Sequence, residues 1–199
     1  AIELYVVNDI ADLSAYGVSS ANNGGGSTGA PEFVFPAVAA TAGQFIYVAS
    51  ESTGFNSFFG FDPDYTSGAA NINGDDAIEL FNSGVVIDVF GDVDVDGTGQ
   101  PWEYTDGWAY RVDATGPDGN TFVLTNWTFS GPNALDGETS NATAATPFPI
   151  GTYSDEALPA ELSGVGSATP TAVFAGDDVL LTVTVTPGED PPSTGITVE

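Results

Sequence analysis

The chain has 199 residues, of which 28 are Asp or Glu, one is Lys or Arg and none is His or Cys, so its formal net charge is −27. Without His or Cys there is no Ser-His-Asp triad, no cysteine nucleophile and no zinc site of nitrogen and sulfur ligands. A chain with a single cation repels nucleic acids and anionic membrane surfaces. We therefore expect no enzyme, no nucleic-acid partner and no membrane insertion.

The high negative charge also favours solubility, whatever the fold. Hydrophobic residues make up 42% of the chain and aromatic residues 12%, which is too much apolar surface for a disordered acidic tail. We expect one sizeable folded domain with a smaller second part.

Short segments rich in β-branched and aromatic residues, each bounded by Gly, Asn, Asp or Pro, predict β-strands. The clearest are residues 2–7, 44–49, 85–90 and 179–185. One short helix is expected at about residues 54–61. Turn signals recur about every ten residues, which favours an all-β sandwich or barrel.

Residues 76–81 and 85–90 flank the turn Asn82-Ser-Gly84 and predict a tight hairpin, with Gly84 adopting a positive φ. The sequence Ala-Ile-Glu-Leu of this hairpin also opens the chain. Both copies predict strands with Ile and Leu on one side and Glu on the other.

After Tyr153 the composition changes, and residues 154–166 predict a linker. Residues 167–199 then predict a partial second β domain, with strands at about 172–174, 178–186 and 195–199. So short a piece buries too little surface to fold alone. We expect a larger protein or a partner to complete it.

Four motifs occur along the chain, at residues 1–5 (AIELY), 12–17 (DLSAYG), 73–80 (NGDDAIEL) and 84–91 (GVVIDVFG). Together they resemble the lamin-tail domain family of bacterial secreted proteins. The resemblance covers residues 1–153 and implies an immunoglobulin-like antiparallel sandwich without catalytic residues. It also implies that the family's usual first strand is missing before Ala1, which leaves a sheet edge unfilled. Residues 167–199 resemble the start of an immunoglobulin-like domain that follows in secreted nuclease and phosphatase precursors.

An acidic loop follows the hairpin and has the spacing of a calcium-binding loop. Its candidate ligands are Asp92, Asp94, Asp96, Thr98, Gln100 and Glu103. Oxygen ligands suit Ca²⁺, so we predict a calcium site in this loop. The flanks are strand and turn, which argues against a true EF-hand. The alternative is that the three aspartates simply share the solvent face of an extended segment.

Aromatic residues are frequent from Trp102 to Tyr110 and at Trp127 and Phe129. They predict core positions, with a sugar-stacking surface as the alternative. Arg111 is the only basic residue, and we expect it to pair with a nearby carboxylate such as Asp106 or Asp113.

The leading hypothesis is a non-catalytic binding, targeting or spacer module of a larger extracellular protein. A first residue Ala1 rather than Met fits a processed secreted segment. Its expected partners are other domains or subunits of an extracellular assembly. The alternative is a filament subunit that self-associates by strand addition, since residues 178–186 alternate Leu or Val with Thr.

Overall fold

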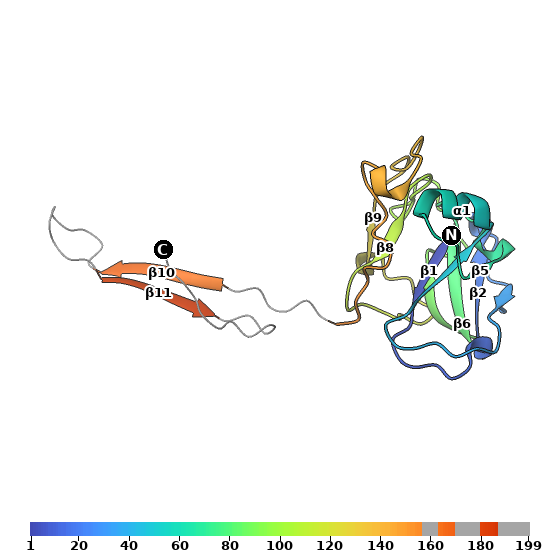
Figure 1. The fold of residues 1–199 in the computed structure, drawn as a ribbon, viewed down its shortest axis with the longest axis horizontal. Helices are drawn as coiled ribbons and strands as arrows, with labels where there is room; N and C mark the ends of the chain where they lie inside the picture. The colour runs from blue at the N-terminus through green and yellow to red at the C-terminus, as the bar shows by residue number, and fades with distance from the viewer. Residues whose placement is uncertain (157–162, 170–179, 187–199) are drawn as a thin grey trace. The chain divides into compact units, whose positions relative to one another are not determined.

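A computed structural model describes residues 1–156, 163–169 and 180–186 and divides the chain into two units, Ala1–Glu156 and Ala157–Glu199. Both are rich in β-strands, most of which pair antiparallel (Figure 1). The described residues contain one α-helix. The β-rich fold expected from the sequence is therefore confirmed at this level.

Unit 1 contains nine strands. They are β1 (Ile2–Tyr5), β2 (Tyr16–Ala21), β3 (Phe33–Val34), β4 (Phe45–Ala49), β5 (Tyr65–Thr66), β6 (Ala77–Asn82), β7 (Val85–Phe90), β8 (Ala109–Arg111) and β9 (Trp127–Phe129). Short 3-10 turns connect them at Leu13–Ala15, Asn22–Gly24, Gly68–Ala70, Leu124–Asn126 and Asn141–Thr143.

These strands form three hydrogen-bonded groups. One sheet has the order β1-β4-β5, a second has the order β3-β2-β6-β7, and β8 pairs with β9 alone. The β4–β5 pair is parallel, and the other pairs of unit 1 are antiparallel.

The core lies between the first two sheets. Ile2, Ile46 and Val48 from one sheet and Val18 from the other are buried there. Ile78 and Leu80 pack against this core but are only partly buried. Burial of large aliphatic side chains from both sheets is the main force that holds the two layers together.

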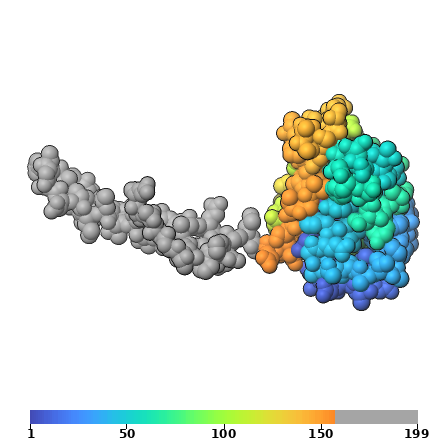
Figure 2. All heavy atoms as spheres, viewed as in Figure 1, coloured from blue at the N-terminus to red at the C-terminus, as the bar shows by residue number. Residues whose placement is uncertain are grey.

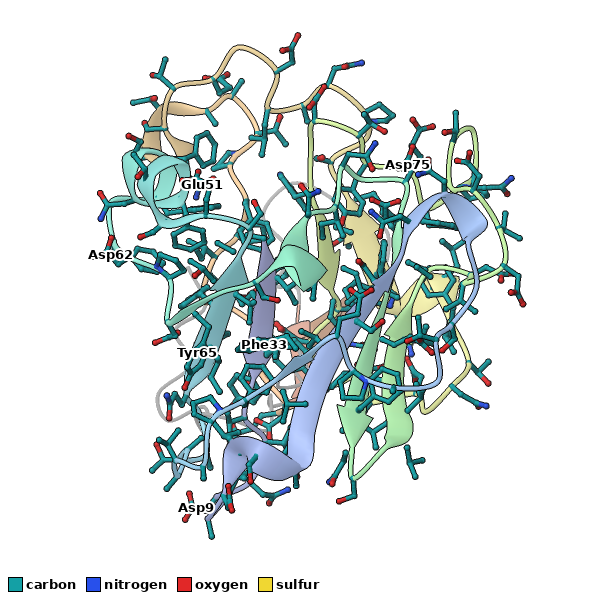
Figure 3. The ribbon with its side chains drawn as sticks, turned by 90° about the vertical axis from the view of Figure 1, so that its right-hand side faces the viewer. Asp9, Phe33, Glu51, Asp62, Tyr65 and Asp75 are labelled. Carbon is teal, nitrogen blue, oxygen red and sulfur yellow. The ribbon has the colours of Figure 1, made fainter. Side chains whose placement is uncertain are left out.

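Edge strands β3 and β5 close one side of this core. The rings of Phe33 on β3 and Tyr65 on β5 meet with their centroids 5.7 Å apart (Figure 3). Phe35 contacts both rings, at 5.1 and 5.5 Å. On β1 and β8, Tyr5 packs on Tyr153 at 5.0 Å and Tyr110 packs on Phe148 at 5.2 Å.

The hairpin β6–β7 forms as expected. Its two turn residues both have positive φ, 51° at Ser83 and 78° at Gly84, the conformation that matches the twist of the flanking strands. The alternation in β6 is also confirmed, because Ile78 and Leu80 face the core. Glu79, on the other face, is nevertheless only 4% exposed. Its carboxylate accepts a hydrogen bond of 2.6 Å from the Ser27 hydroxyl.

The predicted helix is α1, Ser52–Phe59. Glu51 caps its first turn by accepting a hydrogen bond from the Gly54 amide, 2.7 Å. Gly60 ends it with φ of 84°. In Figure 2 the orange segment that leads to Glu156 lies beside the teal surface of α1, and the Phe59 and Phe148 rings join the two.

Unit 2 contains β10 (Ser163–Thr169) and β11 (Leu180–Thr186), which pair antiparallel. β11 matches the predicted strand. β10 begins inside the segment for which the sequence predicts a linker, because small residues of low strand propensity are drawn into the ladder by β11. The strands predicted at 172–174 and 195–199 lie outside the described residues.

Candidate binding cleft and acidic loop

A cleft of about 1030 Å³ opens within unit 1, between the two sheets and the β8–β9 hairpin. Most of its lining is aliphatic or aromatic. The lining from the strands includes Ile2, Leu4, Ile46, Ile78, Leu80, Ile87 and Tyr110. This volume and this chemistry are those of sites that hold apolar ligands or chain segments.

Glu3 lies at the rim of the cleft and joins β1 to β8. Its carboxylate accepts hydrogen bonds from the Tyr110 hydroxyl, 2.9 Å, and from the Gly151 amide, 2.8 Å. The same Tyr110 oxygen accepts from the amides of Thr152 and Tyr153. Burial raises the pKa of Glu3 despite these hydrogen bonds. It likewise raises the pKa of Tyr110.

Arg111 makes the strongest charged contacts of the unit. Its guanidinium lies 2.6 Å from Asp88 and 2.8 Å from Asp118, and it stacks over the Trp127 ring at 4.3 Å. The predictions of Asp106 and Asp113 as partners were wrong. The tertiary fold decides the partner, since it brings Asp88 on β7 and Asp118 in the loop after β8 to Arg111, whereas Asp113 accepts the Ser154 amide instead.

The pKa values of the two partner carboxylates shift in opposite directions. Burial raises the pKa of Asp88 and outweighs the effect of Arg111. For Asp118, burial also acts to raise the pKa, but hydrogen bonds from Asn126 and Arg111 outweigh it and lower the pKa. The guanidinium is thus fully engaged within the protein, with its side chain 12% exposed.

The aromatic residues pack mainly against each other, as the core interpretation predicts. Phe90 on β7 is the centre, with ring contacts of 4.8 to 6.3 Å to Trp102, Tyr104, Phe122, Trp127 and Phe129. Trp102 is 5% exposed. Its ring lies so close to Gly97 that a Cβ there would meet it at 2.5 Å. This contact holds the acidic loop against the core.

The acidic loop consists of turns rather than an extended strand, and its three predicted aspartate ligands are exposed. Asp92 accepts the Asp94 amide at 3.0 Å, and Asp96 accepts the Thr98 amide at 2.9 Å. The latter bond lowers the pKa of Asp96. These carboxylates therefore cap turns of their own loop.

The remaining predicted ligands lie in the same loop, and Gln100 is exposed. Glu103 folds back onto the loop and accepts the Gly99 amide at 2.7 Å and the Thr105 hydroxyl at 3.0 Å. Over the part of the chain that the structure describes, no three acidic side chains converge as a set that could hold a metal ion.

Sequence reasoning missed Asp75, which lies under this loop at the start of β6 (Figure 3). It is 7% exposed, its Oδ2 accepts the Thr98 hydroxyl at 3.1 Å, and its backbone carbonyl accepts the Gly97 amide. Its Oδ1 has no hydrogen-bond partner within the described residues. The Asn-Gly-Asp-Asp run was the available signal, because both of its acids lie directly before a strand and both are buried, Asp76 with 2% exposed.

Comparisons with protein-family models, with curated proteins and with solved structures found no match to this chain. None of the helices in the described ranges is long and apolar enough to cross a membrane.

Proposed function

We propose that the chain is a non-catalytic binding, targeting or spacer module of a larger extracellular protein. The observation that carries the proposal is the cleft of about 1030 Å³ with its apolar and aromatic lining. Two of the charged side chains that line it, Glu3 and Arg111, are bound to other groups of the protein. They hold elements in position, and the apolar surface between them is what remains for a ligand.

We also propose that unit 1 is an immunoglobulin-like sandwich of the lamin-tail type. Two features support it. The two sheets enclose a common core. In addition, the separate β8–β9 pair is joined to β1 by the Glu3–Tyr110 hydrogen bond.

Binding in the cleft is testable with Nile red, an uncharged apolar dye that a strongly negative protein does not repel. We expect saturable binding at about one site per chain. Leu80→Phe fills the cleft and should weaken binding about tenfold, a loss of about 1.4 kcal/mol. Val85→Phe is the matched control on the same hairpin, because Val85 is 64% exposed and does not line the cleft. Equal binding by both variants, or none by the parent, would refute the proposed site.

The proposal includes calcium bound at the acidic loop. Its support is the buried Oδ1 of Asp75 beside Thr98, since a buried carboxylate oxygen without a partner is costly and a cation would satisfy it. Backbone carbonyls of the loop are suitable further ligands for Ca²⁺.

Thermal unfolding in millimolar CaCl₂, compared with NaCl of equal ionic strength, tests the calcium part. We expect a higher melting temperature with calcium, because a ligand that binds only the folded state stabilises it. Asp75→Asn should abolish the difference, whereas Asp106→Asn, at an exposed position, should keep it. An identical melting temperature in both salts would remove calcium from the proposal.

A further inference from the structure

Strand β1 has a free edge. β1 pairs antiparallel with β4, and the Val6 amide donates to the Gln44 carbonyl. Because hydrogen-bonded pairs alternate along an antiparallel ladder, Ile2 and Leu4 are the other residues of β1 that bond to β4. The amides of Glu3 and Tyr5 therefore point away from β4. The amides and carbonyls of Glu3 and Tyr5 take no part in the backbone hydrogen bonds found outside the strand ladders of residues 1–156.

Strand β8 has a matching free edge. Val112 donates its amide to the Asn126 carbonyl and Ser130 donates to Trp108, which fixes the alternation in the ladder with β9. The amides and carbonyls of Ala109 and Arg111 therefore point away from β9. They too lack partners within unit 1.

These two edges lie on either side of a slot in which no strand is paired with them, although side chains of both strands bind residues 151–153 beside it. β8 lies between β9 and β1 (Figure 1), and the Tyr110 hydroxyl reaches the Glu3 carboxylate at 2.9 Å. The two strands nevertheless share no ladder. A row of unpaired backbone groups on each side is a template for an added strand.

The slot has two chemically different faces. Ile2 and Leu4 point to the core side of β1. Glu3 alternates to the other side of the strand, where its carboxylate and the Tyr110 hydroxyl bind the backbone of residues 151–153; the cleft is lined from both sides. A strand that fits must therefore carry apolar side chains on one face and polar side chains on the other.

We propose that this slot accepts the segment Leu180–Thr186 of a second copy of the chain. In its sequence, LLTVTVT, one set of alternate positions holds Leu181, Val183 and Val185. The other set begins with Leu180 and continues with Thr182, Thr184 and Thr186. The Leu/Val row suits the cleft, and the Thr hydroxyls suit the Glu3–Tyr110 side. The inference goes beyond the proposed function, which requires neither self-association nor this segment.

Two further observations favour this occupant. The segment carries no charge in a chain of net charge −27, so it can approach a second copy at lower electrostatic cost than the acidic remainder. Among the described residues of unit 2 it pairs with β10, in a two-stranded sheet. Such a sheet is marginally stable alone, whereas the slot offers backbone partners on both sides.

Sedimentation velocity over a range of concentrations, combined with amide hydrogen exchange, tests the proposal on the full chain. We expect concentration-dependent association, with exchange at Glu3, Tyr5, Ala109 and Arg111 slowed about a hundredfold in the associated state. Val183→Lys places a charge in the apolar row and should give a monomer with fast exchange. Thr184→Lys, the matched control in the polar row, should still associate.

A synthetic peptide of residues 180–186 provides a check that does not depend on variants. In excess it should dissociate the oligomers while the four amides remain protected. The proposal is overturned by a parent chain that stays monomeric, by equal behaviour of the two lysine variants, or by amides already protected in a monomer, which would mean that the slot is filled within one molecule. Dye binding by a chain that stays monomeric would leave the proposed function intact.

Discussion

Arg111 holds β7, β8 and the segment around Asp118 together, and its removal leaves two largely buried carboxylates without a cation. Removing one partner of such a group costs about 3 kcal/mol. We therefore expect Arg111→Met to lower the free energy of unfolding in urea by about that amount. Asp106→Asn, which changes the net charge by one unit in the opposite direction at an exposed site, should change it by less than about 0.5 kcal/mol. A small loss in Arg111→Met would show that these ion pairs do not stabilise the fold.

Glu3 should make stability depend on pH. Its pKa is raised above the ordinary 4.5 by burial, so ionisation destabilises the folded state. The stability that protonated Glu3 contributes is fully present below pH 4.5 and is lost as pH rises through the raised pKa. Glu3→Gln cannot ionise, and its stability relative to the parent should increase across that window.

Denaturant unfolding of both proteins at several pH values, at high salt to screen the other carboxylates, measures this difference. A difference that stays constant from below pH 4.5 to neutral pH would contradict the assigned cause.

At the level of residues, the sequence was sufficient to predict that Arg111 is paired and that the aromatic residues are largely internal. It was not sufficient to identify Asp88 or Asp118, because the partner depends on which strands face each other. The burial of Asp75 could not be predicted for a similar reason, since it comes from a loop more than twenty residues further along the chain.

At the level of elements, the β6–β7 turn makes a direct prediction. Gly84 has φ of 78°, where a Cβ is strained, so Gly84→Ala should destabilise unit 1 by about 1–2 kcal/mol. Gly68→Ala is the matched control, because nothing lies near a Cβ at Gly68 and its φ is not positive. Urea unfolding should separate the two, and equal effects would show that the turn conformation is not limiting.

The longer apolar strands were predictable from their composition, as β4 and β7 were. Strand β2 was not, because its Gly, Ser and Ala residues have little strand propensity and its position is fixed by pairing with β6 and β3. The short strands β3, β5, β8 and β9 are likewise defined by their partners.

For the whole molecule, a net charge of −27 should destabilise the compact state through self-repulsion. We expect the melting temperature of the chain to rise with NaCl as the charges are screened. A gain of about 1 kcal/mol corresponds to about 2–4 °C for a domain of this size. Calorimetry over a salt series measures it, and a melting temperature independent of salt would show that repulsion is not significant.

The β-rich character and the approximate end of unit 1 were within reach of the sequence, because strand segments and turn residues repeat up to Tyr153. The cleft was not, since it depends on how far the two layers and the β8–β9 hairpin stand apart. No local pattern encodes that spacing.

The central claim, a module of a larger extracellular protein, is tested most directly by the location and intact mass of the natural polypeptide. Antibodies raised against residues 1–156 would be used to isolate it from the culture medium and the cell surface for mass spectrometry. The claim predicts an extracellular polypeptide clearly heavier than the 20.3 kDa of this chain. A natural polypeptide of 20.3 kDa, or one confined to the cell interior, would contradict it.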